Sequence, residues 1–173
     1  DYYDVVTLYE RDGTFNGNSP TELVEVIEND EAGLMNHMGH CDYNIAMGLV
    51  PSSADQLSNT EYPFLYSQGC YALAWDQETS GDVECIGEHF LFAEGGMFAF
   101  VGNSRYGWYT HGSTNGCSQQ YDKQYFVGLF TQNIRNMGNC LSYSKEALAG
   151  SINSGGGTYR WAYYCLNLFG DPQ

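Results

Sequence analysis

The hydrophobic residues of this chain fall into short runs that are separated by helical patterns and by polar, glycine-containing loops. Runs of β-branched, aliphatic and aromatic residues predict four strands, at Tyr3–Tyr9, Gly33–Met38, Pro63–Ser67 and Met97–Val101. The last of these runs is apolar throughout, which is typical of a parallel strand that is covered on both faces. The pattern therefore distributes short strands along most of the chain.

Apolar positions with helical spacing lie between and after these strands. Ser19, Pro20 and Glu22 form a helix start in which serine is the N-cap and proline the first helical residue. Helices are predicted at about 20–30, 83–93, 119–133, 142–149 and 159–168, and residues 41–62 are predicted to be mostly loop. Strands that alternate with helices favour an α/β fold, with a mainly parallel sheet and helices on both faces, in a single domain over residues 1–173.

Composition narrows the classes of function. The 173 residues include 6 Lys and Arg against 21 Asp and Glu, a net charge of −15, which excludes non-specific binding to the phosphates of nucleic acids. No run of about 18 apolar residues is present, so no membrane span is predicted. The 6 cysteines, in an acidic, lysine-poor and tyrosine-rich chain, indicate a secreted or cell-surface protein in which disulfides form. No CxxC pair signals a zinc site, and the pairing of the cysteines stays open.

Two of the predicted strands end on a glycine that is followed by a residue able to do chemistry. His40 and Cys70 each follow such a glycine. Because the carboxyl ends of neighbouring parallel strands meet at one edge of a sheet, an imidazole and a thiol would lie side by side, as a cysteine nucleophile requires. The alternative is a structural cysteine and a histidine that only forms hydrogen bonds. A metal site with His37 is not predicted, because residues i and i+3 of a strand point to opposite faces.

Five blocks of sequence surround these residues. They are 36–40 (NHMGH), 67–70 (SQGC), 85–91 (CIGEHFL), 95–105 (GGMFAFVGNSR) and 168–172 (LFGDP). In this order they resemble the gingipain family of cysteine peptidases, which belongs to the caspase-like clan. The resemblance implies a caspase-like α/β fold and hydrolysis of peptide bonds. It also implies that the chain is the carboxyl-terminal part of a larger catalytic domain.

The resemblance assigns roles to individual residues. His40 would be the general base or acid and Cys70 the nucleophile, and the backbone amides of Cys41 and Cys70 would bind the oxyanion. Trp108 would form a wall of the primary substrate pocket, and the alternative is a buried anchor of a long loop. A peptide or protein substrate is implied, with the upstream half of the catalytic domain as a partner and no required cofactor or catalytic metal.

One departure from the family concerns Cys41, which stands where the family has glycine. The amide proton remains available, but glycine-only conformations are lost and a second thiol lies beside the site. That thiol could pair with another cysteine, even Cys70, and make the activity depend on redox state. Two rival hypotheses are a catalytically inactive caspase-like surface or structural protein, and a hydrolase or acyltransferase that acts on small substrates.

Two groups of side chains have alternative interpretations. Asp42, Asp76, Asp82 and Glu84 could hold calcium as a structural ion, or they could form a solvated acidic rim. Such a rim beside the cleft would favour basic residues on the substrate. The aromatic residues of 159–168 are interpreted as core with a hydrogen-bonded rim rather than as a ligand stack.

Overall fold

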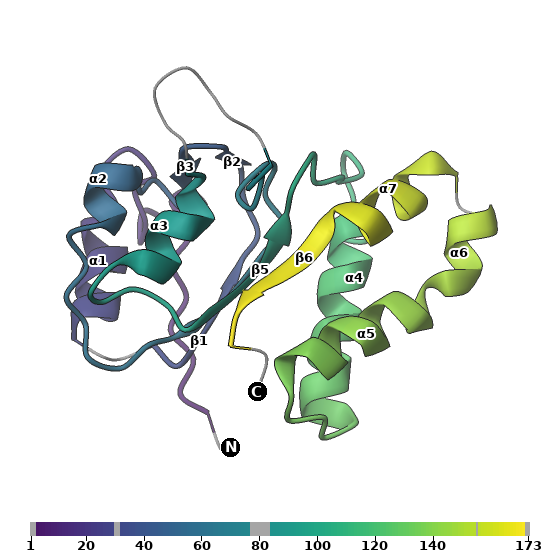
Figure 1. Cartoon of the computed structure of the whole chain (residues 1–173). Coiled ribbons are helices and arrows are strands. Elements are labelled where there is room, and N and C mark those ends of the chain that lie inside the picture. Colours follow the sequence, from purple (N-terminus) through teal and green to yellow (C-terminus); the bar gives the residue numbers. More distant parts are fainter. Residues whose placement is uncertain (1–2, 30–31, 77–83, 155, 172–173) are drawn as a thin grey trace.

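A four-stranded sheet lies at the centre of the computed structural model, which describes residues 3–29, 32–76, 84–154 and 156–171 (Figure 1). In spatial order the strands are β1 (Leu34–His37), β4 (Phe64–Ser67), β5 (Ala99–Asn103) and β6 (Leu166–Gly170). The first three run parallel, and β6 runs antiparallel to β5. The predicted mainly parallel sheet is confirmed.

Helices cover both faces of this sheet (Figure 1). On one face lie α1 (Thr21–Glu28), α2 (Pro51–Ala54) and α3 (Ile86–Phe92), and on the other lie α4 (Cys117–Phe126), α5 (Met137–Ala147) and α7 (Gly157–Cys165). The smaller elements are a 3-10 helix at Glu10–Asp12, the hairpin of β2 (Cys41–Asp42) and β3 (Ile45–Ala46), a π-helical turn at Val127–Thr131, and α6 (Ala149–Ser154). The predicted α/β class with helices on both faces of the sheet is confirmed.

The two faces of the sheet carry separate cores, because successive side chains of a strand point to opposite sides. Every residue of β4 is buried. Leu65 packs into the core with α1 and α3, whereas Phe64 and Tyr66 pack into the core with α4 and α5. The ring of Tyr125 stacks on Phe64 with centroids 5.5 Å apart. This double cover holds the central strands, and with them the loops that leave their carboxyl ends.

The amino-terminal segment differs from its prediction. Residues 3–9 form no strand, and the side chains of Val5 and Val6 are 79% and 61% exposed. β-Branched residues favour a strand only where a neighbouring strand completes the hydrogen bonds, and no strand of the described residues pairs with this segment. The predicted strand at Tyr3–Tyr9 is therefore wrong.

The last apolar segment also differs from its prediction. The predicted helix 159–168 ends at Cys165, and the chain continues directly into β6, where Leu166 pairs with Asn103 of β5. Leu168 packs against the core of α4 and α5, and Phe169 packs against the core of α1 and α3. This alternation is that of a strand in a sheet covered on both faces, and a helical period does not describe it.

Other boundaries shift by a few residues. Helix α1 begins at Thr21 with Pro20 as its N-cap, and the predicted helix 119–133 is α4 followed by the π-helical turn. Helix α3 begins at Ile86, and Val83, where its prediction began, lies outside the described residues. Within the described ranges, no helix has the length and apolar character that crossing a membrane requires.

Candidate active site

The register of β1 and β4 brings the two predicted catalytic residues to the same edge of the sheet. His37 lies opposite Ser67, and the Gln68 amide donates to the His37 carbonyl oxygen at 3.2 Å. His40 and Cys70 each follow this pair by three residues. Both of them line a cleft of about 1540 Å³. Parallel pairing of two strands is thus enough to bring an imidazole and a thiol into one cleft.

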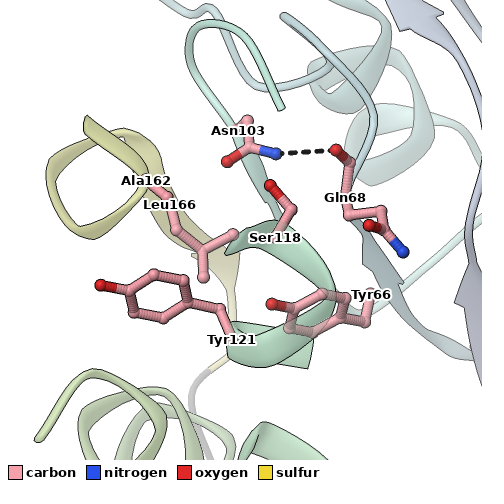
Figure 2. Close-up of a pocket in the computed structure, with 7 residues that line it drawn as sticks. All are labelled: Tyr66, Gln68, Asn103, Ser118, Tyr121, Ala162 and Leu166. Atoms are coloured by element: carbon pink, nitrogen blue, oxygen red, sulfur yellow. Dashed lines mark hydrogen bonds between the residues drawn. The ribbon is translucent and has the colours of Figure 1, made fainter. Parts of the chain in front are cut away.

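Hydrogen bonds from β5 fix the turn that carries Cys70. The side-chain amide of Asn103 donates to the carbonyl oxygens of the two residues before Cys70, at 3.0 and 3.1 Å, and the first of these bonds is drawn in Figure 2. Cys70 is half-buried, and its Sγ lies 3.8 Å from the carbonyl oxygen of Gly107. Among the hydrogen bonds of the described residues, none joins Cys70 to His40, which is exposed. The two residues line the same cleft without a hydrogen bond between them among the described residues.

The two amides expected to bind an oxyanion lie near each other. A Cβ atom at Gly69 would lie 3.0 Å from the Cys41 amide nitrogen, so this amide borders the residue that precedes Cys70. The amides on either side of Cys70 donate to Ser67 Oγ at 3.1 Å and to the Arg105 carbonyl oxygen at 2.9 Å. Within the described part of the chain, no hydrogen bond uses the Cys70 amide between them. Their role in binding an oxyanion stays a prediction.

The side chain of Cys41 enters a small polar cluster beside Gly69. Its Sγ lies 3.5 Å from Ser67 Oγ and 3.6 Å from His37 Nδ1, and these two partners lie 2.9 Å from each other. The backbone of Cys41 belongs to β2, so no glycine-only conformation is needed there. The side chain fits because Gly69 has none, since a Cβ atom at Gly69 would collide with Cys41 Sγ. The sequence did not indicate that His37 and Ser67 would hold this thiol.

Burial keeps this cluster uncharged. It lowers the pKa of His37 from 6.5 to about 4, and the charge of His40 lowers that pKa further. It raises the pKa of the Cys41 thiol from 9.0 to about 12. Because the thiolate is the nucleophilic form of cysteine, this raised pKa makes the Cys41 thiol a poor nucleophile at neutral pH.

Trp108 borders the cleft on the side of α4. Its amide donates to Ser118 Oγ at 2.8 Å, and its carbonyl oxygen accepts from the Ser118 amide at 3.0 Å. The side chain of Trp108 is 36% exposed and lines the same cleft as Cys70. The Trp108 side chain is therefore not buried, although its backbone is held by the two hydrogen bonds with Ser118. The role of Trp108 in a substrate pocket stays a prediction.

The acidic residues considered as a calcium site do not share one position. Asp76 is paired with Arg105 through two hydrogen bonds of 2.8 and 2.7 Å, Asp42 lines the cleft, and Glu84 is exposed. Asp82 lies outside the described residues. In the part of the chain that the structure describes, no group of three or more His, Cys, Asp or Glu side chains is arranged to hold a metal ion. Calcium stays an untested prediction.

All six cysteines carry free thiols, so the expected disulfides are not found. The four buried ones are Cys85, Cys117, Cys140 and Cys165. They lie on different elements, at the start of α3, in α4, in α5 and at the end of α7. Two of them donate to nearby carbonyl oxygens, from Cys117 to Thr158 at 3.3 Å and from Cys140 to Ile134 at 3.4 Å.

A row of buried polar atoms lies between β4 and α4. Tyr66 Oη, Gln68 Nε2, Gln119 Oε1 and Asp122 Oδ1 are buried and have no hydrogen-bond partner among the described residues. Burial raises the pKa of Asp122 from 3.8 to about 6, although a hydrogen bond from Asn36 opposes the shift. The sequence does not reveal this row, because a glutamine or aspartate on a helix looks the same whether its side chain faces solvent or the sheet.

The two ends of this row differ. Gln68 and Gln119 border the cleft that holds Cys70. Tyr66 lies deeper, beside Ser118 and Tyr121 in the recess of Figure 2, which has no space for a water molecule. Of the four residues in this row, only Gln68 and Gln119 therefore border the cleft.

A mainly parallel sheet between two helical layers, with histidine and cysteine beyond neighbouring strands, defines a caspase-like α/β fold of the kind that cysteine peptidases use. The chain belongs to peptidase family C25, the gingipain family, whose family model matches residues 1–173. No curated protein matches the chain in sequence.

Solved structures agree with this assignment. The crystal structure of the Arg-specific cysteine proteinase gingipain R is similar with a TM-score of 0.72 and 16% sequence identity, over 88% of this chain and 35% of that one. A structure described only as a protease is similar with a TM-score of 0.60 and 15% identity, over 86% of this chain and 36% of that one. At this identity the similarity shows the fold, and the chain spans little more than a third of either relative.

Proposed function

We propose that this chain carries the catalytic dyad of a cysteine endopeptidase, with Cys70 as nucleophile and His40 as general base and acid. The observation that supports this most is the β1–β4 register, which sets both residues beyond paired strand ends and along one cleft. The family assignment supports the same chemistry. Fold alone does not establish activity, so the proposal depends on these two residues rather than on the architecture.

The reaction follows from these positions. His40 accepts the thiol proton of Cys70, and the thiolate attacks the carbonyl carbon of the peptide bond. The amides of Cys41 and Cys70 donate to the resulting oxyanion. The C–N bond then breaks as His40 gives the proton to the leaving amine, and water hydrolyses the thioester that remains. No step needs a metal or cofactor.

The acidic lining of the cleft favours a substrate that carries basic residues. Asp4, Glu10 and Asp42 line it, and no Lys or Arg of the described residues does. Gingipain R, which shares the fold, is described as Arg-specific. An acidic cleft attracts cationic peptides, and salt weakens this attraction by screening the charges. We expect kcat/KM for peptides with Arg or Lys before the cleaved bond to exceed that for Leu or Glu and to fall as ionic strength rises.

The open edge of the sheet supports one partner, which is a further part of a larger catalytic domain. β1 lies at the edge of the sheet, with Leu34 38% exposed and Asn36 also exposed. An open strand edge is a site for pairing with another strand. In the full-length protein we expect the amides of residues 34–37 to exchange hydrogen more slowly than in the isolated chain, and equal exchange in the two would argue against this partner.

A thiol-reactive peptide probe tests the catalytic proposal. In the full-length protein we expect covalent labelling that is lost in Cys70→Ala, lost or strongly slowed in His40→Ala, and kept in Cys41→Ala. Cys41→Ala is the matched control, because that thiol borders the same cleft and has a pKa of about 12. Absence of labelling in the wild-type protein would favour the rival proposal of an inactive caspase-like surface or structural protein.

A further inference from the structure

Four aromatic side chains form a connected strip that begins next to the proposed nucleophile. The rings of Tyr71 and Tyr106 have centroids 4.9 Å apart, those of Tyr106 and Trp108 are 6.3 Å apart, and those of Trp108 and Trp161 are 6.2 Å apart. Tyr71 directly follows Cys70 in the sequence. We call these four residues the aromatic strip.

The aromatic strip is open to solvent, unlike most large aromatic residues of the two cores. Tyr106 is 51% exposed, Trp161 is 41% exposed and Trp108 is 36% exposed. The strip leads from the cleft toward α7, which lies beside the loop that follows β5 (Figure 1). The aromatic residues of 159–168 were expected to form core and rim. Trp161 instead contacts Trp108, which lines the cleft.

The backbone of the strip is fixed before any ligand arrives. The Tyr71 amide donates to the Arg105 carbonyl oxygen at 2.9 Å, and the Trp108 backbone is bonded twice to Ser118 at the start of α4. Trp161 lies within the helical backbone of α7. A preformed surface loses little conformational entropy on binding, which favours affinity.

The spacing of the rings matches an extended polypeptide. Successive residues of such a chain rise about 3.3 Å, so side chains on one face are about 6.6 Å apart. The steps from Tyr106 to Trp108 and from Trp108 to Trp161 are 6.3 and 6.2 Å. Each of these two steps thus corresponds to two residues of a peptide that lies along the strip, whereas the step from Tyr71 to Tyr106 is shorter, at 4.9 Å.

The orientation of the rings separates a peptide from a sugar ligand. Neighbouring rings are inclined by 83°, 63° and 86°, so each pair is edge-to-face. Rings turned against one another in this way present no common plane on which a row of sugars would stack. Exposed aromatic faces accept compact apolar side chains and also bind proline well.

We propose that the aromatic strip is an extended substrate subsite, which binds a polypeptide segment flanking the cleaved bond through apolar or proline side chains at alternate positions. This inference rests on the proposed peptidase function. It adds to that function a binding requirement at the Trp161 end of the strip, because Trp161 is not among the residues that line the cleft with His40 and Cys70.

Kinetics with matched substrates test the strip. Three peptides share the residues around the cleaved bond: a short one, one extended on both sides with Leu or Pro at alternate positions, and one extended with Ser and Gly. We expect the apolar extension to raise kcat/KM about tenfold through KM, because burying one apolar side chain against an aromatic ring is worth roughly that factor. Trp161→Ala should lose this advantage and cleave the short peptide as the wild-type protein does.

Two further variants serve as controls. Tyr164→Ala also removes an exposed aromatic residue of α7, but Tyr164 contacts Tyr163 and lies outside the strip, so its kinetics should not change. Tyr106→Ala removes an inner ring of the strip and should repeat the loss seen with Trp161→Ala, so the test stands even if one of the two variants folds poorly. Thermal unfolding identifies such a variant.

Binding separates failure of this inference from failure of the proposed function. In Cys70→Ala, tryptophan fluorescence should report tighter binding of the apolar peptide than of the Ser and Gly peptide, with no cleavage needed. If the wild-type protein cleaves nothing, the peptidase proposal fails, and this binding still decides the role of the strip. Equal binding of the two peptides, or a Trp161-dependent response to a chitin oligosaccharide instead, would overturn the inference.

Discussion

Gly69 is the position where one added methyl group should most directly disturb the candidate active site. A Cβ atom there would collide with Cys41 Sγ, would lie 2.7 Å from Cys41 Cβ, and would lie 3.0 Å from the Cys41 amide nitrogen. The backbone of Gly69 is outside the left-handed region, so the cost of Gly69→Ala is steric and not torsional. The neighbour that must move also carries one of the two amides expected to bind the oxyanion.

The size of the effect follows from the packing. Extra carbon atoms in a well-packed interior cost about 1–3 kcal/mol, and we expect Gly69→Ala to lower the free energy of unfolding by about that amount. A displacement of about 1 Å in a catalytic group lowers the rate by about 100-fold. Urea denaturation measures the first effect, and kcat/KM on a short peptide measures the second.

A double-mutant cycle identifies the cause. Cys41→Gly removes the Sγ and Cβ atoms with which the new methyl group collides and leaves the amide in place. Gly69→Ala should therefore cost less in the Cys41→Gly background, with a coupling of about 1–2 kcal/mol. Gly33→Ala is the matched control, because a Cβ at Gly33 meets nothing within 4 Å, and it should change stability by less than about 0.5 kcal/mol. If the two substitutions are additive, the collision with Cys41 is not the reason for the loss.

Three more predictions concern titration. Burial raises the pKa of Asp122 from 3.8 to about 6, so the native state holds this proton more tightly and stability falls as pH rises from about 4 to about 6. In urea denaturation, Asp122→Asn should raise the free energy of unfolding by up to about 3 kcal/mol at pH 8 and change it little at pH 4. The control Asp4→Asn, at an exposed position, should show no such difference between the two pH values. Burial lowers the pKa of His37 to about 4, so the unfolded chain binds its proton first and stability falls as pH drops from about 6.5 to about 4. His37→Gln should remove that acid sensitivity, and an unchanged pH profile would contradict the burial of the imidazole. Alkylation by iodoacetamide at pH 8, followed by mass spectrometry, should modify Cys70 at least about 100-fold faster than Cys41, because the Cys41 thiol has a pKa of about 12. Comparable rates would show that Cys41 is not held in the buried cluster.

Much of the sheet and its helices could be read from periodicity. The strands near 34–37, 64–67 and 99–103 and the helices between them follow apolar patterns that depend only on neighbours along the chain. The glycines before His40 and Cys70 marked the ends of two such strands. These local signals were sufficient to predict a parallel α/β fold and to nominate the pair of residues that now share one cleft.

Local sequence patterns are therefore sufficient to predict the class of fold, the order of the motifs and the residues able to carry nucleophilic chemistry. Other features depend on the folded chain: residues 3–9 pair with no strand of the described residues, β6 is a strand, His37 and Ser67 surround the Cys41 thiol, and Trp161 contacts Trp108. Pairing, burial and contact between distant segments depend on which surfaces meet after folding. Periodicity along the chain describes one element at a time, and so it cannot report on partners that lie 26 or 53 residues away.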